Sequence, residues 1–528
     1  MSNFSTTLAH STVRQLIECG VTDFVLSPGS RNAPLSIALH QASEAGLINL
    51  HVRIDERGAG FFALGLSRAS DRYVVCICTS GTAVANYHPS ALEAFHSDAK
   101  LLFLTADRPA RLRNTGANQT TLQDGILSPL ATLDTAEIFD PRKVLLGGPA
   151  HINLQFDEPL LPSEMSSTWL DSIQVKPLDA EELGNAADRL TVKSDGVIIV
   201  GHDRGNFSVD EINEFVDILD WPLIAEDPLS FPDAIPHAAL FLSDEGVRAA
   251  LQCEEVIVIG RTTLSRSINA YIASIDEVIV IDPRIETVDI DRSASQVFSM
   301  IPQVTKHSTT SEWLELWKSC GRVSVDRITH EIEWSEQLAL RAIAHNIPDE
   351  SALFIGSSRP VRDIEGYAAP RGGISTFANR GLAGIDGNIA TAFGIATQFE
   401  RSYSILGDLT FLHDISALVN LPDVSHTIFI IDNNGGGIFS TLPQAGVPGF
   451  EEIFGTPHNK NIPAIVSAFG LPVQVLKTVS EIEMVIAKRL SGVNVVVVEV
   501  PDRQLNAARV KQLTQSVSSA VRIGSNLA

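Results

Sequence analysis

The chain has 528 residues, which is enough for about three domains of ordinary size. Hydrophobic residues make up 44% of it, so a sizeable core is available, and a net charge of −24 argues against nucleic acid and anionic membranes as partners. No run approaches the ~18 apolar residues of a membrane span. No signal peptide is visible in residues 1–16, and the five cysteines are scattered, so we expect a cytoplasmic protein without a disulfide framework.

Apolar, β-rich segments alternate with helical patterns along the chain, which predicts an α/β protein of three doubly wound domains with parallel sheets. In the first third, strands are predicted at 23–26, 48–54, 73–78 and 101–105, and helices at 33–45, 58–70 and 83–96. A polar, proline-bearing stretch at 159–177 is interpreted as a linker.

The middle segment has predicted strands at 196–200, 222–225, 256–259 and 277–281. The last third opens with a predicted helix at 334–346, followed by strands at 353–356, 403–406, 427–431 and 494–500. The domains are accordingly predicted at 1–177, 178–333 and 334–528.

Two predicted strands of the last third end in polar residues that suit a metal ion. One strand is followed by Gly407 and Asp408, and the other by a run that contains Asn433 and Gly435. Ligand sites of doubly wound sheets lie at the carboxyl ends of strands. A carboxylate, an amide oxygen and a backbone carbonyl are hard ligands that suit Mg²⁺ on a diphosphate. The alternative is an ordinary βαβ unit with polar strand ends. Between these strands, apolar residues at helical spacing predict a helix through 411–421.

Three features of the first third also follow predicted strands. Ser30 and Arg31 lie in a Gly/Ser loop before a helix, which is an anion site by geometry, with a solvated capping turn as the alternative. Glu56 stands where a predicted strand ends and a helix begins, which makes it a candidate functional carboxylate. The alternative is that it only makes a favourable contact with the helix dipole. Arg108, Asn118 and Gln119 follow the fourth strand, so we expect them near the same sheet edge.

The Gly-Asp…Asn-Asn pattern resembles the cofactor signature of thiamine diphosphate enzymes. Leu409 departs from it, because many members have a third glycine there. The run Asp432-Asn433-Asn434 leaves its register open, and we place the metal ligand at Asn433 because Gly435 then follows two residues later. Further motifs occur in order: Ser-Pro-Gly-Ser-Arg, Asp-Glu-Arg-Gly, Thr-Ser-Gly-Thr-Ala-Val-Ala-Asn, Ala-Asp-Arg-Pro, Gly-Ala-Asn-Gln, Asn-Arg-Gly-Leu-Ala-Gly-Ile-Asp-Gly and Asn-Asn-Gly-Gly-Gly-Ile-Phe.

Together these motifs, within 27–439, resemble the menaquinone-pathway carboligases, in which 2-oxoglutarate and isochorismate are joined. The resemblance implies catalytic roles for Glu56, Arg31 and Arg380. It implies cofactor contacts from Glu56, Ser358, Ile385, Gly407, Asp408, Leu409, Asn433, Gly435, Ile438 and Phe439. It implies metal binding by Asp408, Asn433 and Gly435, with Mg²⁺ expected and Mn²⁺ as an alternative. Substrate contacts are implied for Ser30, Arg31, Arg108, Asn118, Gln119, Arg266, Arg362 and Arg380.

The resemblance thus implies a transferase that uses thiamine diphosphate and Mg²⁺ to decarboxylate 2-oxoglutarate and ligate the remainder to isochorismate. It also implies a homodimer or a dimer of dimers, with the cofactor between two chains. An acetolactate-synthase-like carboligase is the nearest alternative, which the arginines disfavour because pyruvate has one carboxylate. A non-catalytic binding protein is disfavoured by the intact Glu56, Asp408 and Asn433. For Arg266, the alternative to substrate binding is that it is a solvated arginine in a loop. No histidine is assigned a role, and His413 is the one flagged for its nearness to Asp408 in sequence.

Overall fold

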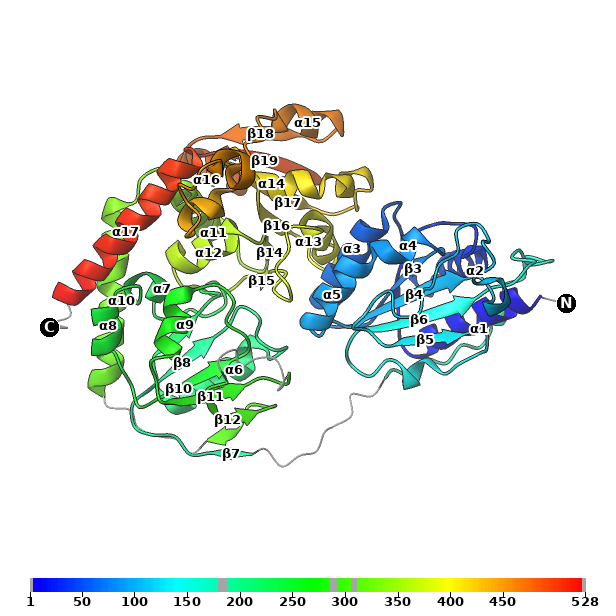
Figure 1. Ribbon diagram of the computed structural model, residues 1–528, viewed down its shortest axis with the longest axis horizontal. Helices are drawn as coiled ribbons and strands as arrows, with labels where there is room; N and C mark the ends of the chain where they lie inside the picture. Colours follow the sequence, from blue (N-terminus) through cyan, green and yellow to red (C-terminus); the bar gives the residue numbers. More distant parts are fainter. Residues whose placement is uncertain (1–2, 179–187, 285–291, 305–310, 525–528) are drawn as a thin grey trace. The chain divides into compact units, whose positions relative to one another are not determined.

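The computed structural model describes residues 3–178, 188–284, 292–304 and 311–524. The chain forms two compact units (Figure 1). Unit 1 comprises Met1–Glu182, Gly381–Glu400 and His413–Val424, and unit 2 comprises Leu183–Arg380, Arg401–Leu412 and Ser425–Ala528. Three parallel sheets with interleaved helices confirm the predicted α/β class.

Unit 1 is built on a six-stranded parallel sheet with the order β2-β1-β3-β4-β6-β5. Its strands are β1 (Asp23–Leu26), β2 (Asn49–Val52), β3 (Val74–Cys78), β4 (Leu101–Asp107), β5 (Thr132–Thr135) and β6 (Ala150–Gln155). Its helices are α1 (Phe4–Glu18), α2 (Ala33–Glu44), α3 (Glu56–Ser70), α4 (Thr82–Asn86), α5 (His88–His96) and α13 (Asn388–Ala396). Helices α1 and α2 lie on one side of the sheet, and α3 and α5 on the other (Figure 1).

Helices α3 and α13 pack closely because glycines bring their backbones together. A Cβ atom on Gly65 would lie 2.0 Å from the Thr391 carbonyl oxygen, and one on Gly394 would lie 2.0 Å from the Phe62 carbonyl oxygen. No side chain fits at either position without a shift of the facing backbone. This contact holds α13 in unit 1 although its chain neighbours lie in unit 2.

The first sheet of unit 2 has five parallel strands in the order β12-β11-β10-β8-β9. These are β8 (Gly196–Val200), β9 (Leu223–Ala225), β10 (Glu255–Ile259), β11 (Glu277–Ile281) and β12 (Ala294–Phe298), and a separate small sheet pairs β7 (Arg189–Leu190) with β13 (Gln303–Val304). The helices of this part are α6 (Val209–Leu219), α7 (Ala238–Phe241), α8 (Glu245–Ala250), α9 (Arg266–Ile272) and α10 (Ser311–Glu331).

The second sheet of unit 2 has six parallel strands in the order β15-β14-β16-β17-β19-β18. These are β14 (Ala352–Ile355), β15 (Ser375–Phe377), β16 (Ser402–Gly407), β17 (His426–Asp432), β18 (Val473–Leu476) and β19 (Val493–Glu499). The helices are α11 (Glu336–Asn346), α12 (Arg359–Tyr367), α14 (Asp408–His413), α15 (Ile462–Ala468), α16 (Val479–Ala487) and α17 (Arg503–Gly524). Val517 and Val521 of α17 share a core with Trp317 of α10, so the last helix joins both halves of unit 2.

Each of the three large sheets reverses its strand order beside the first of its strands in the sequence. The reversal falls between β1 and β3, between β8 and β10, and between β14 and β16. In doubly wound sheets, ligands bind at such switch points, outside the carboxyl ends of the strands. The loops after these strands are therefore where binding chemistry is expected.

All the predicted strands are present, with ends that agree or differ by one or two residues. The helix predicted at 83–96 is instead two helices, α4 and α5, that meet at Tyr87, and Pro89 lies in the first turn of the second. The helix predicted through 411–421 is wrong in extent, because α14 ends at His413 and a 3₁₀ turn, η4 (Ile415–Val419), follows. The stretch interpreted as a linker packs on unit 1, where Leu160 and Leu170 belong to the core. The domain boundaries stay a prediction.

Among the residues described, no helix combines the length and the apolar character that a membrane crossing requires.

Candidate active site

The metal-ligand candidates of unit 2 lie together at the carboxyl ends of β16 and β17. Asp408 is 2% exposed, and its Oδ2 accepts a hydrogen bond of 2.8 Å from the Gly435 backbone N–H. Its Oδ1 accepts one of 2.6 Å from the backbone N–H of Leu409. The two strand ends are thereby joined through Asp408, as the sequence predicts for parallel neighbours.

The side-chain amide of Asn433 is held in one orientation. Its Nδ2 donates a hydrogen bond of 2.6 Å to Oε1 of the buried Glu336, and Asn506 Nδ2 donates to the same oxygen at 3.1 Å. The Asn433 Oδ1 is buried and has no hydrogen-bond partner in the described part of the chain. A buried acceptor without a partner costs free energy unless a ligand satisfies it. Together with Asp408, this oxygen fits the donor set of Mg²⁺.

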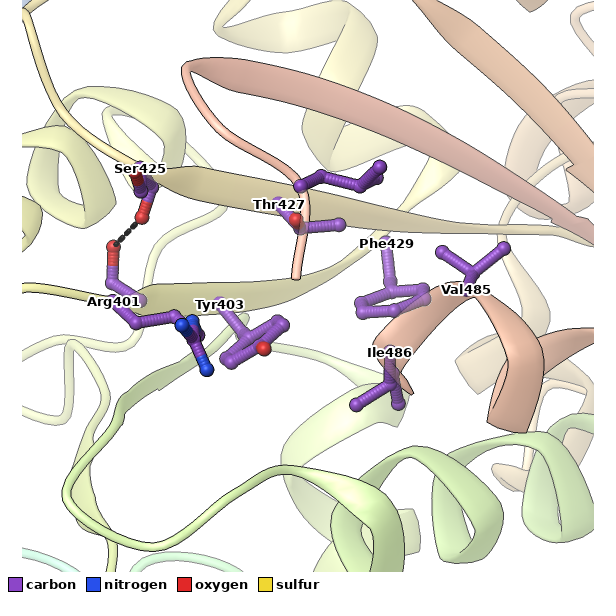
Figure 2. Close-up of a pocket in the computed structure, with 9 residues that line it drawn as sticks. Arg401, Tyr403, Ser425, Thr427, Phe429, Val485 and Ile486 are labelled. Atoms are coloured by element: carbon purple, nitrogen blue, oxygen red, sulfur yellow. Dashed lines mark hydrogen bonds between the residues drawn. The ribbon is translucent and has the colours of Figure 1, made fainter. Parts of the chain in front are cut away.

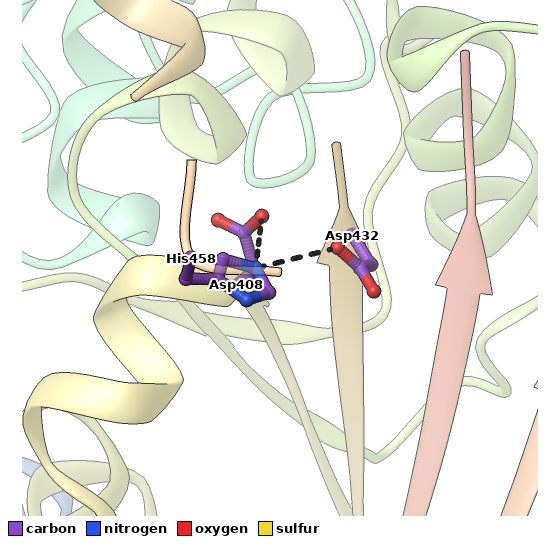
Figure 3. Close-up of side chains that lie close together, drawn as sticks. All are labelled: Asp408, Asp432 and His458. Atoms are coloured by element: carbon purple, nitrogen blue, oxygen red, sulfur yellow. Dashed lines mark hydrogen bonds and ion pairs between the residues drawn. The ribbon is translucent and has the colours of Figure 1, made fainter. Parts of the chain in front are cut away.

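His458 is a neighbour of Asp408 that the sequence analysis did not single out. Its Nε2 lies 3.2 Å from Asp408 Oδ2 and 3.6 Å from Asp432 Oδ1, and Figure 3 shows the imidazole between the two carboxylates. The hydrogen bond with Asp408 raises the pKa of His458, and burial raises the pKa of Asp432. A long stretch of chain separates His458 from Asp432 in the sequence. No periodicity or motif therefore indicates that His458 belongs to this cluster.

The flagged His413 does not join this cluster. It is exposed in unit 1, where its Nδ1 lies 3.3 Å from Arg57 Nη1.

The loop after Asn433 needs glycine and is held by an arginine from α17. Gly435 has φ +139°, and a Cβ there would lie 2.1 Å from Arg503 Nη1 and 2.2 Å from the Gly455 carbonyl oxygen. Arg503 also donates to the Asn434 carbonyl at 2.8 Å. Ile438 and Phe439 follow in a 3₁₀ turn, η5 (Gly437–Thr441), and the Phe439 ring packs 5.6 Å from that of Phe454.

Four further candidates of unit 2 lie on the loops or helices that follow β14, β15 and β10. Ser358 precedes α12 with φ +76°, an unusual backbone for a non-glycine residue, and such strain gathers at binding sites. Arg362 Nη1 donates to the Ser358 carbonyl at 2.7 Å, and burial lowers the pKa of Arg362. Arg380 is 3% exposed and contacts Thr263, whereas Arg266 is exposed at the start of α9.

Unit 1 brings its own group of candidates together. Arg108 Nη1 donates to Ser80 Oγ at 2.9 Å and to the Gln119 carbonyl at 2.7 Å. Arg31 is close enough that its charge contributes to lowering the pKa of Arg108, although burial is the larger cause. The Nε atom of Arg31 is buried without a hydrogen-bond partner in the described residues. Ser30 and Asn118 are exposed beside this group in sequence.

Glu56 and Ile385 also belong to unit 1. Glu56 is half-buried in the first turn of α3, and its charge is among the causes that raise the pKa values of the buried Cys78 and Tyr87. Ile385 is half-buried in the loop before α13. That loop is anchored by the buried Glu93, whose carboxylate accepts N–H bonds from Gly381 at 2.6 Å and Leu382 at 2.7 Å.

A small cavity lies at the opposite, amino-terminal ends of β16 and β17. Figure 2 shows it between Tyr403, Phe429 and Ile486. Ser402, which also lines it, donates a hydrogen bond of 3.3 Å to the Ser425 carbonyl. Its volume is about 10 Å³, which is room for a single water molecule. It is too small for a substrate and contains none of the candidate residues.

Comparisons with known proteins agree with this geometry. Residues 6–127 match the family model of the thiamine pyrophosphate enzyme N-terminal TPP binding domain, and residues 167–355 match that of the thiamine pyrophosphate middle domain. With these matches, and with a carboxylate and an amide oxygen at the carboxyl ends of neighbouring parallel strands, the class is defined: the chain is a thiamine pyrophosphate (thiamine diphosphate) enzyme.

Three relatives share one name, 2-succinyl-5-enolpyruvyl-6-hydroxy-3-cyclohexene-1-carboxylate synthase. The protein of Nocardioides sp. is 36% identical over 93% of this chain and 94% of its own length. That of Thermobifida fusca is 34% identical over 98% and 100%, and that of Geobacillus kaustophilus is 31% identical over 97% and 98%. The chain belongs to the 2-succinyl-5-enolpyruvyl-6-hydroxy-3-cyclohexene-1-carboxylate synthase family.

Proposed function

We propose that this chain decarboxylates 2-oxoglutarate and adds the remaining succinyl unit to isochorismate, giving the product for which its relatives are named. The observation that carries the proposal is the pair formed by Asp408 and the partnerless, buried Oδ1 of Asn433 at the carboxyl ends of the neighbouring strands β16 and β17, the first of which borders the switch point of the last sheet. An enzyme of this family needs a metal-bound diphosphate there. A scaffold that had lost the activity would have no reason to keep a buried acceptor unsatisfied.

Asp408, Asn433 Oδ1 and the Gly435 carbonyl would hold Mg²⁺, and Ser358 would contact the diphosphate. Thiamine diphosphate, when bound, supplies the electron sink that a decarboxylation of a 2-oxo acid requires. Glu56 would hold a proton at the aminopyrimidine ring. Ile385, Ile438 and Phe439 would supply apolar surface around the cofactor, which excludes water from the reacting atoms.

The arginines would bind the substrates, since both carry two carboxylates. Arg31 and Arg108 are adjacent in unit 1, and Arg362 and Arg380 lie within unit 2. Two guanidinium groups close together repel each other, and an anionic ligand relieves that repulsion. Gln119 and Asn118 would add hydrogen bonds to hydroxyl or carboxylate oxygens. Arg266 is exposed, so its contact with substrate is the weakest of these assignments.

The test combines the purified chain with thiamine diphosphate and either Mg²⁺ or Mn²⁺, and follows CO₂ and the ligated product. We expect CO₂ from 2-oxoglutarate and ligated product only when isochorismate is also present. Pyruvate is the control, because it is a 2-oxo acid that lacks the CH₂–COO⁻ end of 2-oxoglutarate and so has a single carboxylate. Use of pyruvate in place of 2-oxoglutarate would identify an acetolactate-type enzyme, and no turnover of either would contradict a catalytic function.

A further inference from the structure

The first sheet of unit 2 has its own switch point, and no role has been given to it so far. Its order β12-β11-β10-β8-β9 reverses between β8 and β10, and sheets of this type bind ligands at such a crevice. Three segments meet there: 201–204 after β8, Glu226 after β9, and 260–264 after β10. The groups that occupy this crevice indicate whether this part of the chain can bind a ligand there.

The two loops that border the crevice are in backbone contact. Asp203 and Arg261 form an isolated antiparallel bridge. A Cβ on Gly201 would lie 2.2 Å from the Arg261 carbonyl oxygen, and one on Gly260, whose φ is +69°, would lie 2.1 Å from the Asp203 carbonyl oxygen. Glycine at both positions permits this close approach of the two loops that border the crevice.

The backbone N–H groups at this crevice are taken up by a carboxylate of the chain itself. Glu226 is 0% exposed. Its Oε1 accepts from the backbone N–H of Thr263 at 2.9 Å and of Leu264 at 2.8 Å, and its Oε2 accepts from Thr263 at 2.9 Å and His202 at 3.1 Å. This is the arrangement by which such loops bind an external anion. Here the anion is internal, so it fixes the loop 260–264 in place of a ligand.

The fixed loop in turn holds Arg380. The guanidinium Nε donates to Thr263 Oγ1 at 3.0 Å, and Nη2 donates to the Thr263 carbonyl at 3.3 Å. Arg261 Nη2 donates to the Arg380 carbonyl at 2.8 Å while also contacting Asp203 Oδ2 at 2.9 Å. The loop 260–264 therefore fixes the position of both the main chain and the side chain of Arg380. Glu226 in turn fixes the position of that loop.

We propose that the residues at this crevice position a substrate-binding side chain. Glu226 fixes the loop 260–264, so that Thr263 orients the guanidinium of Arg380 toward substrate. The inference rests on the proposed function, which assigns Arg380 to a substrate carboxylate. An arginine side chain loses much rotational freedom when it engages a ligand, and an arginine already held at Nε and Nη2 has less left to lose. Thr263 and Glu226 are positioning residues in this account, because they act on substrate through Arg380.

The test begins with Arg380→Ala, which identifies the substrate whose KM depends on Arg380. Thr263→Val, which keeps the shape and removes the hydroxyl, should raise the same KM about tenfold, as expected for the loss of one hydrogen bond to a charged group. Thr263→Ser restores the hydroxyl and should restore the KM. Thr262→Val is the matched control in the same loop, because the Thr262 hydroxyl makes no hydrogen bond to Arg380 in the described structure.

The double variant separates positioning from general damage to the fold. In the Arg380→Ala background, Thr263→Val should change neither KM nor kcat further, since the group that it orients is gone. An equal effect in both backgrounds overturns the inference. Glu226→Gln replaces one acceptor oxygen by an amide that faces N–H groups, and it should raise the same KM with the affinity for thiamine diphosphate unchanged. A loss of thermal stability with an unaltered KM in that variant also overturns the inference.

Failure of the proposed function gives a different pattern. If the unmodified protein forms no ligated product, that function is contradicted, and the same variants are compared by calorimetric titration with 2-oxoglutarate and with isochorismate. Affinity that falls in Arg380→Ala and Thr263→Val and returns in Thr263→Ser supports the positioning role. Equal affinities across the series overturn it.

Discussion

The metal proposal depends on single atoms, so it is best tested at single residues. Asp408→Ala removes the carboxylate that joins the ends of β16 and β17. The affinity for thiamine diphosphate in the presence of Mg²⁺ should then fall to the value measured without metal, because the diphosphate charge is no longer neutralised there. Calorimetric titration with and without Mg²⁺ measures both values.

Asp432→Asn is the control for that experiment. Asp432 lies in the same cluster, with His458 Nε2 3.6 Å away, but it is not a proposed ligand. Its replacement should weaken cofactor binding far less than Asp408→Ala does. The opposite ranking would move the metal ligand from Asn433 to Asp432 and show that the register chosen for the Asp-Asn-Asn run is wrong.

A second residue-scale consequence concerns pH. His151 is 0% exposed, between the hydroxyls of Thr105 at 2.9 Å and Thr132 at 3.0 Å, and burial lowers its pKa from 6.5 to about 4. The unfolded chain binds a proton at this histidine below pH 6.5, whereas the folded chain does so only near pH 4. The free energy of unfolding therefore falls as the pH drops through this window, by about 3 kcal/mol from this residue.

His151→Gln removes that contribution while offering an amide to the same two hydroxyls. The difference in unfolding free energy between the unmodified chain and the variant should shrink by about 3 kcal/mol from pH 6.5 to 4, as measured by urea titration. A difference for His151→Gln that is constant with pH would contradict the argument.

At the scale of elements, the contact between α3 and α13 gives a matched pair of glycines in one helix. Gly65→Ala places a Cβ 2.0 Å from the Thr391 carbonyl oxygen, so the two helices must separate. Gly58→Ala places one 3.5 Å from the nearest atom, Asp55 Oδ2, which is ordinary contact. We expect Gly65→Ala to lower the free energy of unfolding by about 1–3 kcal/mol.

Gly58→Ala should instead be neutral or stabilise α3 by about 0.5–1 kcal/mol, because alanine is the better helix former. Thermal unfolding compares the two variants directly. Equal effects would mean that helix propensity, rather than the packing of α13 on α3, decides stability at both positions.

The elements also show where sequence reasoning works. Strands β1, β8 and β11 are predicted to the residue, because continuous apolar runs with clear polar ends mark buried parallel strands. Strand β6 was not predicted, because its residues His151 and Asn153 are polar yet buried in a hydrogen-bonded network. Its apolar residues Ile152 and Leu154 are also buried, but they alternate with the polar ones, so no continuous apolar run marks the strand.

The candidate site shows the same difference between residues that the sequence indicates and residues that it does not. Asp408 and Asn433 could be placed from the sequence because each follows an apolar strand. His458, Glu336 and Arg503 could not, because they reach Asp408, Asn433 and Asn434 from distant segments and only tertiary folding brings them there. Glu226 was missed for a related reason: a lone carboxylate after a short strand gives no sign that four N–H contacts converge on it.

At the scale of the whole molecule, the proposed active site needs residues of both units. Glu56 lies in unit 1, and Asp408 and Asn433 lie in unit 2. We propose that the site forms between unit 1 of one chain and unit 2 of a second, so that a C₂ dimer is the smallest active assembly. In such a dimer, each of the two sites takes Glu56 from one chain and Asp408 from the other.

This arrangement predicts complementation between two inactive variants. Glu56→Gln and Asp408→Ala are mixed under conditions where subunits exchange. A mixed dimer then has one site with both lesions and one site with neither, so activity should return to about a quarter of the normal level if exchange is random and the sites are independent. Each variant mixed only with itself is the control and should stay inactive. If exchange is demonstrated with differently tagged chains and no activity returns, the sites are either built within one chain or strongly coupled. Activity in a strictly monomeric preparation would exclude the shared site, because a single chain would then be able to build a complete site from its own residues.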